Sequence, residues 1–172
     1  MQITTPLDDS QIINLKAGDK IELSGFIYTA RDAAHLRMFE TIQKGEKPPF
    51  NYAGQVVFYA GPCPAPPGKP IGSVGPTTAG RMDLYSPALI KAGLRVMVGK
   101  GNRSPEVVNA IKTYSGLYMV AVGGVAALMA KCVVSSEVVA YDDLGTEAIR
   151  KLEIDKMPLI VAIDKNGGSL YE

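Results

Sequence analysis

The chain has 172 residues, of which 47% are hydrophobic, so it can bury a sizeable core and is most simply one domain spanning residues 1–172. Eighteen basic and seventeen acidic side chains leave a net charge of +1, which gives no electrostatic reason to expect nucleic acid or an anionic membrane as a partner. Residues 1–15 lack the basic segment and apolar core of an export signal, and no apolar run has the length of a membrane span, so a cytoplasmic location is expected.

In the first half of the chain, short apolar runs separated by glycine and proline predict mainly strands. Strands are predicted over residues 12–15, 20–29 and 55–60. Residues 32–43 predict a helix that ends near Gly45. The run GPCPAPPGKP, residues 61–70, contains too many prolines for a helix or a central strand and indicates an extended, rigid loop.

In the second half, predicted helices alternate with strands rich in Val, Ile and Ala. Helices are predicted over residues 82–92, 105–114 and 125–131, and strands over 95–98, 117–122, 133–140 and 159–163. Ser104 before Pro105 is typical of an N-cap followed by the first helical turn. The pattern indicates an α/β or mixed α+β fold. Because no helix is predicted between the first two strands, it also favours a β-rich N-terminal layer beside an α/β C-terminal part.

The chain contains two cysteines, Cys63 and Cys132, and one histidine, His35. The cysteines are far apart and form no CxxC motif, so neither a disulfide framework nor a zinc site is expected, and no metal ligand is assigned. Cys132 lies in an apolar run and is expected to be buried. Cys63 could either fill a loop or lie close to a site. These residues are too few to ligate an iron-sulfur cluster.

The loop GSVGPTTAGRMD, residues 72–83, combines glycines and a proline with side chains suited to binding a carboxylate. Arg81 offers a planar guanidinium that can pair with a carboxylate through two hydrogen bonds, and Thr77 and Thr78 add hydroxyl groups. The competing interpretation is an ordinary tight turn capped by threonines, because Gly, Pro and Thr are common turn residues.

Two further cations favour a binding site over an ordinary turn. Arg31, in YTARDAAH, follows one predicted strand, and Lys100, in VMVGKGNRSPE, follows another. Strand ends gather ligands at one edge of a sheet, so these cations are expected to converge with Thr77 on a small anion. The Lys100 segment does not match a Walker phosphate loop, because Gly101 follows the lysine and the spacing to Gly93 is wrong.

Neighbouring residues are expected to support the site without performing the chemistry. Asp32 would cap the following helix or orient Arg31, and His35 would pack or donate hydrogen bonds behind the site. Ser104 could both cap its helix and donate to a ligand. Arg103 and Lys69 are expected to be solvated loop charges.

In this order and at these separations, RDAAH, GPTTAGRMD and GKGNRS resemble the beta half of the class I, iron-sulfur-dependent fumarate hydratases and the similar tartrate dehydratase beta subunits. The GGVAAL run at residues 123–128 and the tail KMPLIVAIDKNGGSLYE extend the resemblance over nearly the whole chain. Two residues differ from that pattern: Ala30 replaces an expected glycine and Leu36 a more usual lysine.

The resemblance implies a swivelling β/β/α fold and reversible hydration of fumarate to malate. It implies that Thr77 is the catalytic proton-transfer residue and that Arg31, Arg81, Lys100 and Thr78 bind the dicarboxylate. It further implies a [4Fe-4S] cluster carried by a partner alpha subunit in an α2β2 assembly, and a site completed by an aspartate of that partner. Tartrate dehydration, and an anion-binding or structural subunit without turnover, remain the alternatives.

Overall fold

The computed structural model describes residues 1–121 and 126–171, in which helices and strands alternate along most of the chain. The strands are β1 (Gln2–Thr4), β2 (Lys20–Thr29), β3 (Val56–Phe58), β4 (Val96–Gly99), β5 (Leu117–Ala121), β6 (Val133–Ala140) and β7 (Ile149–Ile163). The helices are α1 (Asp9–Asn14), α2 (Asp32–Gln43), α3 (Ser86–Lys91), α4 (Pro105–Tyr114) and α5 (Ala126–Lys131), with 3₁₀ turns η1 (Ala79–Met82) and η2 (Asp142–Glu147). The mixed α/β fold class predicted from the sequence is confirmed.

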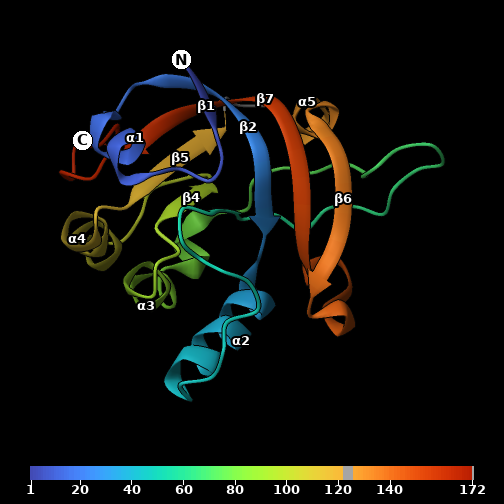
Figure 1. Cartoon of the computed structure of the whole chain (residues 1–172), viewed down its shortest axis with the longest axis horizontal. Coiled ribbons are helices and arrows are strands. Elements are labelled where there is room, and N and C mark those ends of the chain that lie inside the picture. Colours follow the sequence, from blue (N-terminus) through green and yellow to red (C-terminus); the bar gives the residue numbers. More distant parts are fainter. Residues whose placement is uncertain (122–125, 172) are drawn as a thin grey trace.

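All of these strands belong to one sheet, which closes on itself through β7 (Figure 1). Strands β2, β3, β4 and β5 are parallel neighbours in that order. The long strand β7 pairs antiparallel with both β5 and β2, so these five strands form a closed ring. Closure places the carboxyl ends of β2, β3 and β4 side by side at one edge of the ring.

The two faces of the sheet contribute to two different apolar clusters. Successive strand residues point to opposite faces, and accordingly Val56 and Phe58 belong to one apolar cluster while Val57 and Tyr59 belong to the other. Helices α2, α3 and α4 cover the second cluster on the outside of the ring (Figure 1). Burying one large apolar side chain contributes roughly 1.5–3 kcal/mol, so the two clusters together supply most of the driving force for folding.

The predicted strand at residues 12–15 is wrong, because this segment belongs to helix α1. The Asp8 side chain accepts a hydrogen bond from the Gln11 backbone N–H at 2.8 Å, and the Asp8 N–H donates to the Gln11 side chain at 3.0 Å. This reciprocal capping box starts a helix in a stretch whose apolar residues alone would also suit a strand. The separate N-terminal β layer is also wrong, since β2 pairs with the C-terminal strand β7 along most of its length.

Other helices and strands begin or end at residues different from those predicted. The predicted helix over 82–92 is divided into η1 and the short helix α3. The predicted strand at 159–163 is only the end of the 15-residue strand β7, whose earlier half intersperses charged residues with apolar ones. The predicted strand 117–122, the helix 125–131 and the GGVAAL run extend partly into residues 122–125, which lie outside the described residues.

Several sequence-based elements agree with the structure residue for residue. Strands β2 and β6 and helices α2 and α4 have the predicted bounds. The proline-rich segment forms an exposed excursion, which projects from the body at the right of Figure 1. None of the described helices is long and apolar enough to cross a bilayer.

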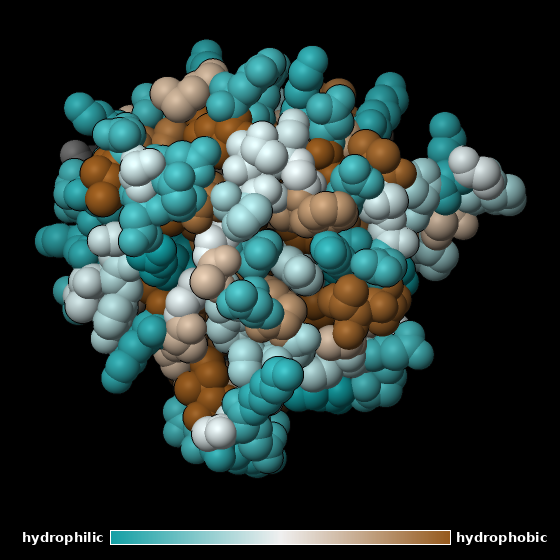
Figure 2. All heavy atoms as spheres, in the orientation of Figure 1, coloured by the Kyte–Doolittle hydropathy of each residue, from teal (hydrophilic) through white to brown (hydrophobic). Residues whose placement is uncertain are grey.

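The face shown in Figure 2 is mostly hydrophilic, with separate brown areas, some of them on the side where β6 lies. Val134, Val138 and Val139 of β6 are the exposed apolar side chains there.

Candidate functional site

The candidate site lies at the carboxyl ends of three adjacent parallel strands. Arg31 follows β2, and Lys100 directly follows β4. The segment after β3 runs through Tyr59 and the proline-rich loop before it returns to Thr77 at the same edge. The structure therefore brings together the strand exits that the sequence predicted would converge.

The threonine loop is hydrogen-bonded between the exits of β3 and β4. The Thr77 N–H donates to the Tyr59 carbonyl at 2.6 Å, and the Lys100 N–H donates to the Thr77 carbonyl at 3.3 Å. The Ala79 N–H donates to the Lys100 carbonyl at 2.8 Å, and Thr78 and Lys100 form a parallel bridge. The loop therefore acts as a short extra strand, so the positions of Thr77, Thr78 and Lys100 are coupled through backbone bonds.

This insertion requires close approach at Gly99, the last residue of β4. A Cβ atom there would lie 2.8 Å from the Tyr59 ring and 3.1 Å from the Ala79 side chain. Gly99 is therefore the residue that allows the loop to sit against the strand end.

Arg31 and Arg81 flank the carboxylate of Asp32 from two segments. Arg81 Nε donates to Asp32 Oδ1 at 3.0 Å, and Arg31 Nε lies 3.8 Å from Asp32 Oδ2. Neither Arg31 Nε nor Asp32 Oδ2 has a hydrogen-bond partner among the described residues. The Arg31 side chain packs over Gly61, where a Cβ would lie 2.8 Å from Arg31 Cδ.

Asp32 orients arginines and does not cap its helix. Helix α2 begins at Asp32 itself, and the residue before it provides no side-chain cap. The N–H of Ala33 in the first turn instead donates to Glu147 Oε1 of η2 at 3.2 Å. Of the two roles expected for Asp32, the structure supports the one that orients arginine.

The electrostatics of this edge favour an anion. Arg31, Arg81 and Lys100 contribute three positive charges, and Asp32 and Glu147 contribute two negative charges, so this edge is net positive. The side chain of Arg81 is 54% exposed and that of Asp32 is 33% exposed, and pairs in such solvated positions contribute only about 0–1 kcal/mol. An incoming carboxylate can therefore compete for the guanidinium groups at little cost to folding.

His35 lies behind the site as a neutral, buried side chain. It is 1% exposed, and its Nδ1 lies 2.9 Å from the Arg31 carbonyl, to which it donates. Its ring meets Tyr59 edge-on, with centroids 5.0 Å apart. Burial lowers the pKa of His35 to about 4, so the ring carries no charge near neutrality. This placement fits the supporting role expected for it.

Ser104 is the N-cap of α4, as predicted. Its hydroxyl accepts from the Val107 N–H at 3.3 Å, and its own N–H donates to Asp83 Oδ2 at 2.6 Å. The Ser104 hydroxyl is thus already used in starting the helix.

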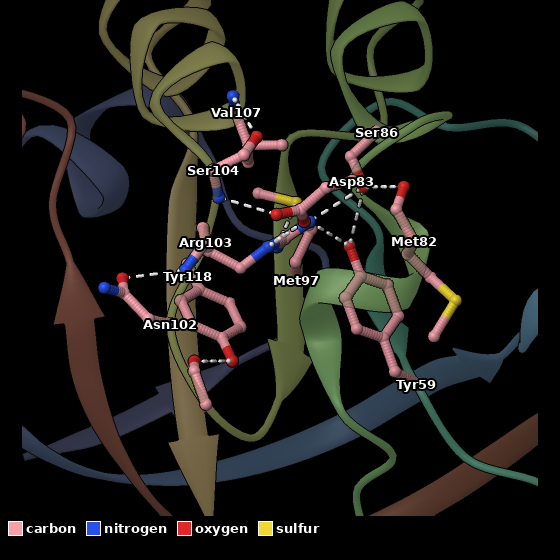
Figure 3. A network of polar contacts seen from close by, with 11 residues as sticks. Tyr59, Met82, Asp83, Ser86, Met97, Asn102, Arg103, Ser104, Val107 and Tyr118 are labelled. Carbon is pink, nitrogen blue, oxygen red and sulfur yellow. Dashed lines mark hydrogen bonds and ion pairs between the residues drawn. The ribbon is translucent and has the colours of Figure 1, made fainter.

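Arg103 is not a solvated loop charge as expected, because its side chain is fully buried. Its guanidinium lies between the rings of Tyr118 and Tyr59 (Figure 3), 4.8 and 5.2 Å from their centroids. Nε donates to Asp83 Oδ1 at 2.7 Å, and Nη2 donates to Ser86 Oγ at 2.8 Å. No local sequence pattern indicates this network, since its members come from four separate segments. Lys69, by contrast, is exposed on the proline-rich loop as expected.

The cysteines show no arrangement suited to a metal cluster. Cys63 is exposed on the proline-rich loop, and Cys132 is half-buried, with a thiol pKa raised by burial. Within residues 1–121 and 126–171, no three His, Cys, Asp or Glu side chains lie close enough to hold a metal ion. The described residues therefore do not fit an iron-sulfur cluster.

Comparisons with known proteins agree with the family resemblance of the sequence. The family model described as the fumarase C-terminus matches residues 1–172. The aerobic class I fumarate hydratase of Escherichia coli K12 is 38% identical over 165 residues, covering 95% of this chain and 30% of that protein. The mitochondrial fumarate hydratase 1 of Leishmania major is 39% identical over 155 residues, covering 89% of this chain and 28% of that protein.

A second kind of relative has nearly the same length as this chain. A Methanocaldococcus jannaschii protein named "Putative L(+)-tartrate dehydratase subunit beta" is 38% identical over 176 residues, covering 96% of this chain and 88% of that protein. This chain thus spans about a third or less of the fumarate hydratases cited above but most of the beta-type relative. The match of the whole chain to the family model, together with these identities, shows that the chain belongs to the fumarase C-terminus family.

Proposed function

We propose that this chain is the beta subunit of a hydro-lyase that reversibly hydrates fumarate to malate. The observation that carries the proposal is the convergence of Thr77 with three cations at the ends of adjacent parallel strands. A dicarboxylate needs cationic contacts at both ends, and a hydro-lyase also needs a group that can exchange a proton with the neighbouring carbon. Arg31, Arg81 and Lys100 would supply the cationic contacts, and Thr77 would supply the proton-exchanging group.

The cations are proposed to bind and orient the two carboxylates. Arg31, Arg81 and Lys100 supply charge-assisted donors, with Thr78 as an additional hydroxyl donor. Proton loss from carbon develops negative charge on the adjacent carboxylate, and fixed cations stabilise that charge as it forms. The backbone hydrogen bond between Thr77 and Lys100 would hold the Lys100 ammonium group and the Thr77 hydroxyl at defined positions relative to each other.

Thr77 is proposed to exchange the carbon-bound proton. In the dehydration direction, the deprotonated Thr77 oxygen would accept a proton from the carbon next to a carboxylate, the C–C double bond would form, and the C–O bond on the adjacent carbon would break. The departing hydroxide would take up the proton that Thr77 released on its own deprotonation and leave as water. A threonine hydroxyl is a weak base in water, so the nearby cations must favour its deprotonated form, or a partner carboxylate must share its proton.

The remaining parts of the site are proposed to come from a partner. We assign the [4Fe-4S] cluster to an alpha subunit, where it would act as a Lewis acid on the substrate, in an α2β2 assembly located in the cytoplasm. The ratio of lengths supports this division, because the chain covers a minor part of the fumarate hydratases but most of a relative named as a beta subunit. The proposed composite site predicts that the chain alone is inactive.

Dehydration of tartrate is the second candidate activity. It is favoured by the beta-type relative, which is named as a putative L(+)-tartrate dehydratase beta subunit. Both substrates present two carboxylates, so the cations described above suit either.

An anaerobic assay of the chain, alone and reconstituted with its cluster-bearing partner, tests these proposals. Fumarate consumption and tartrate dehydration are followed side by side with Thr77→Ala, Thr77→Ser and the distant control Thr113→Ala. We expect fumarate turnover only in the complex, a loss of at least 100-fold with Thr77→Ala, partial recovery with Thr77→Ser, and no effect of Thr113→Ala.

The other outcomes reassign the protein in defined ways. Tartrate turnover without fumarate turnover would change the substrate. Turnover by the chain alone would refute the composite site. A complex that forms and binds fumarate without turning over either substrate would indicate a binding subunit.

A further inference from the structure

We propose that Arg103 is a positioning residue for this site: its buried guanidinium fixes the three segments that carry Thr77, Arg81 and Lys100 relative to one another. The inference rests on the proposed function for its kinetic consequence. Its structural consequence can be measured on the chain without any activity. Figure 3 shows the contacts of the Arg103 side chain and of Asp83 on which it depends.

The first segment is the loop after β4. Arg103 lies three residues after Lys100 in this loop. The Tyr118 hydroxyl of β5 also contacts the loop, because it donates a hydrogen bond to the Gly101 carbonyl at 2.8 Å. The Tyr118 ring also lies 4.8 Å from the guanidinium of Arg103. The segment that follows Lys100 is therefore tied to buried groups at Gly101 and at Arg103.

The second segment is the turn η1 and its exit. Asp83, two residues after Arg81, accepts from Arg103 Nε at 2.7 Å and from the Ser104 N–H at 2.6 Å. Both carboxylate oxygens of Asp83 are thus occupied by the loop after β4. A shift of the Arg81 turn away from Lys100 would break both bonds in a site where the Arg103 side chain is 0% exposed.

The third segment is the exit of β3. Arg103 Nη2 lies 3.3 Å from the Tyr59 hydroxyl, and it also donates to Ser86 Oγ at 2.8 Å. The backbone of Tyr59 accepts from the Thr77 N–H at 2.6 Å, and its own N–H donates to the Val98 carbonyl at 2.8 Å. Anchoring the Tyr59 side chain therefore anchors the residue to which Thr77 is bonded.

Arginine is required because each of its three nitrogens has its own partner. Nε binds Asp83, Nη2 binds Ser86 and Tyr59, and Nη1 donates to the sulfur of Met97 at 3.4 Å. A lysine ammonium keeps the charge but is a single compact donor, and it cannot reach all three directions or stack flat between two rings. Arg103→Lys consequently loosens the geometry while leaving Asp83 with a positive partner.

The first test measures backbone amide exchange of the chain by NMR. In Arg103→Lys we expect the amides of Thr77 and Lys100 to exchange at least tenfold faster. The Thr5 amide, which donates to the Ser24 carbonyl at 2.9 Å in another part of the sheet, should change less than threefold. Arg95→Lys is the matched control, since Arg95 precedes β4 at the end opposite Lys100 and bonds to Asp9 and the Tyr114 carbonyl.

The second test measures kinetics of the complex with its cluster-bearing partner. We expect Arg103→Lys to lower kcat at least tenfold with KM changed less than threefold, because misplacement of Thr77 affects the chemical step more than carboxylate binding. Arg95→Lys should keep kcat within twofold of the unmodified complex. If Arg103→Lys does not fold, Tyr59→Phe replaces it in both tests, with an expected threefold change in exchange and in kcat.

The outcomes separate this inference from the proposed function. Unchanged exchange at Thr77 and Lys100, or faster exchange at Thr5 to the same degree, would overturn the positioning role. An unchanged kcat in an active complex would do the same. Absence of turnover in the unmodified complex, with locally faster exchange in the variant, would refute the proposed function and leave the structural role standing.

Discussion

The buried imidazole of His35 predicts a specific loss of stability in mild acid. Its ordinary pKa of 6.5 falls to about 4 in the folded chain because burial opposes the charged form. Between these values the unfolded chain binds a proton that the folded chain does not, so the free energy of unfolding falls as the pH falls. Stability from this residue is fully present above pH 6.5 and is lost as the pH approaches 4.

The magnitude follows from the two pKa values. Each pKa unit corresponds to about 1.36 kcal/mol, so His35 removes roughly 3 kcal/mol at full titration and about 2.5 kcal/mol between pH 7.5 and 4.5. His35→Phe keeps a ring against Tyr59 and abolishes the titration. The Arg31 carbonyl keeps its hydrogen bond from the backbone N–H of residue 35, at 2.8 Å.

The assay is urea unfolding of both proteins at pH 7.5, 6.0 and 4.5. Carboxylates titrate in both, so the difference between the two pH dependences isolates the imidazole. We expect the unmodified chain to lose about 2.5 kcal/mol more than His35→Phe over this range. Parallel pH dependences would refute the reasoning, because they would mean that His35 titrates alike in the folded and unfolded chains.

Three further variants and one control, Gly80→Ala, test the structure around the site by urea unfolding at neutral pH. Gly99→Ala should cost about 1–3 kcal/mol, because its Cβ would meet the Tyr59 ring at 2.8 Å, whereas Gly80→Ala, whose Cβ would meet its nearest atom only at 4.0 Å, should change stability by less than about 0.5 kcal/mol. Equal effects of the two would contradict the close approach at Gly99. Ser104→Ala should cost about 1 kcal/mol through loss of the α4 cap, and a change below about 0.3 kcal/mol would argue against that cap. Met82→Ala, at the fully buried last residue of η1, should cost about 2–5 kcal/mol, and a smaller loss would indicate that the loop collapses onto the cavity.

Sequence reasoning succeeded where local patterns decide the structure. Helix α4 follows from Ser104 and Pro105, whose capping geometry acts within one turn. The alternation of apolar residues indicated β2, and the apolar runs before Arg31 and Lys100 were enough to place these two residues at strand ends. The failure at residues 12–15 has a local cause too, because a short apolar run suits either element and the capping box before it decides for the helix.

The sequence by itself determined the α/β class, the family and the residue types that an anion would meet. Only the tertiary structure decided that β7 closes the sheet and that Asp32 forms ion pairs with both Arg31 and Arg81. It also decided that Arg103 is buried among Asp83, Ser86 and Tyr59. The physical reason is the distance along the chain over which each effect acts. Periodicity and capping act between neighbours a few residues apart, whereas burial of a charge depends on groups that only the closed sheet brings within hydrogen-bonding distance.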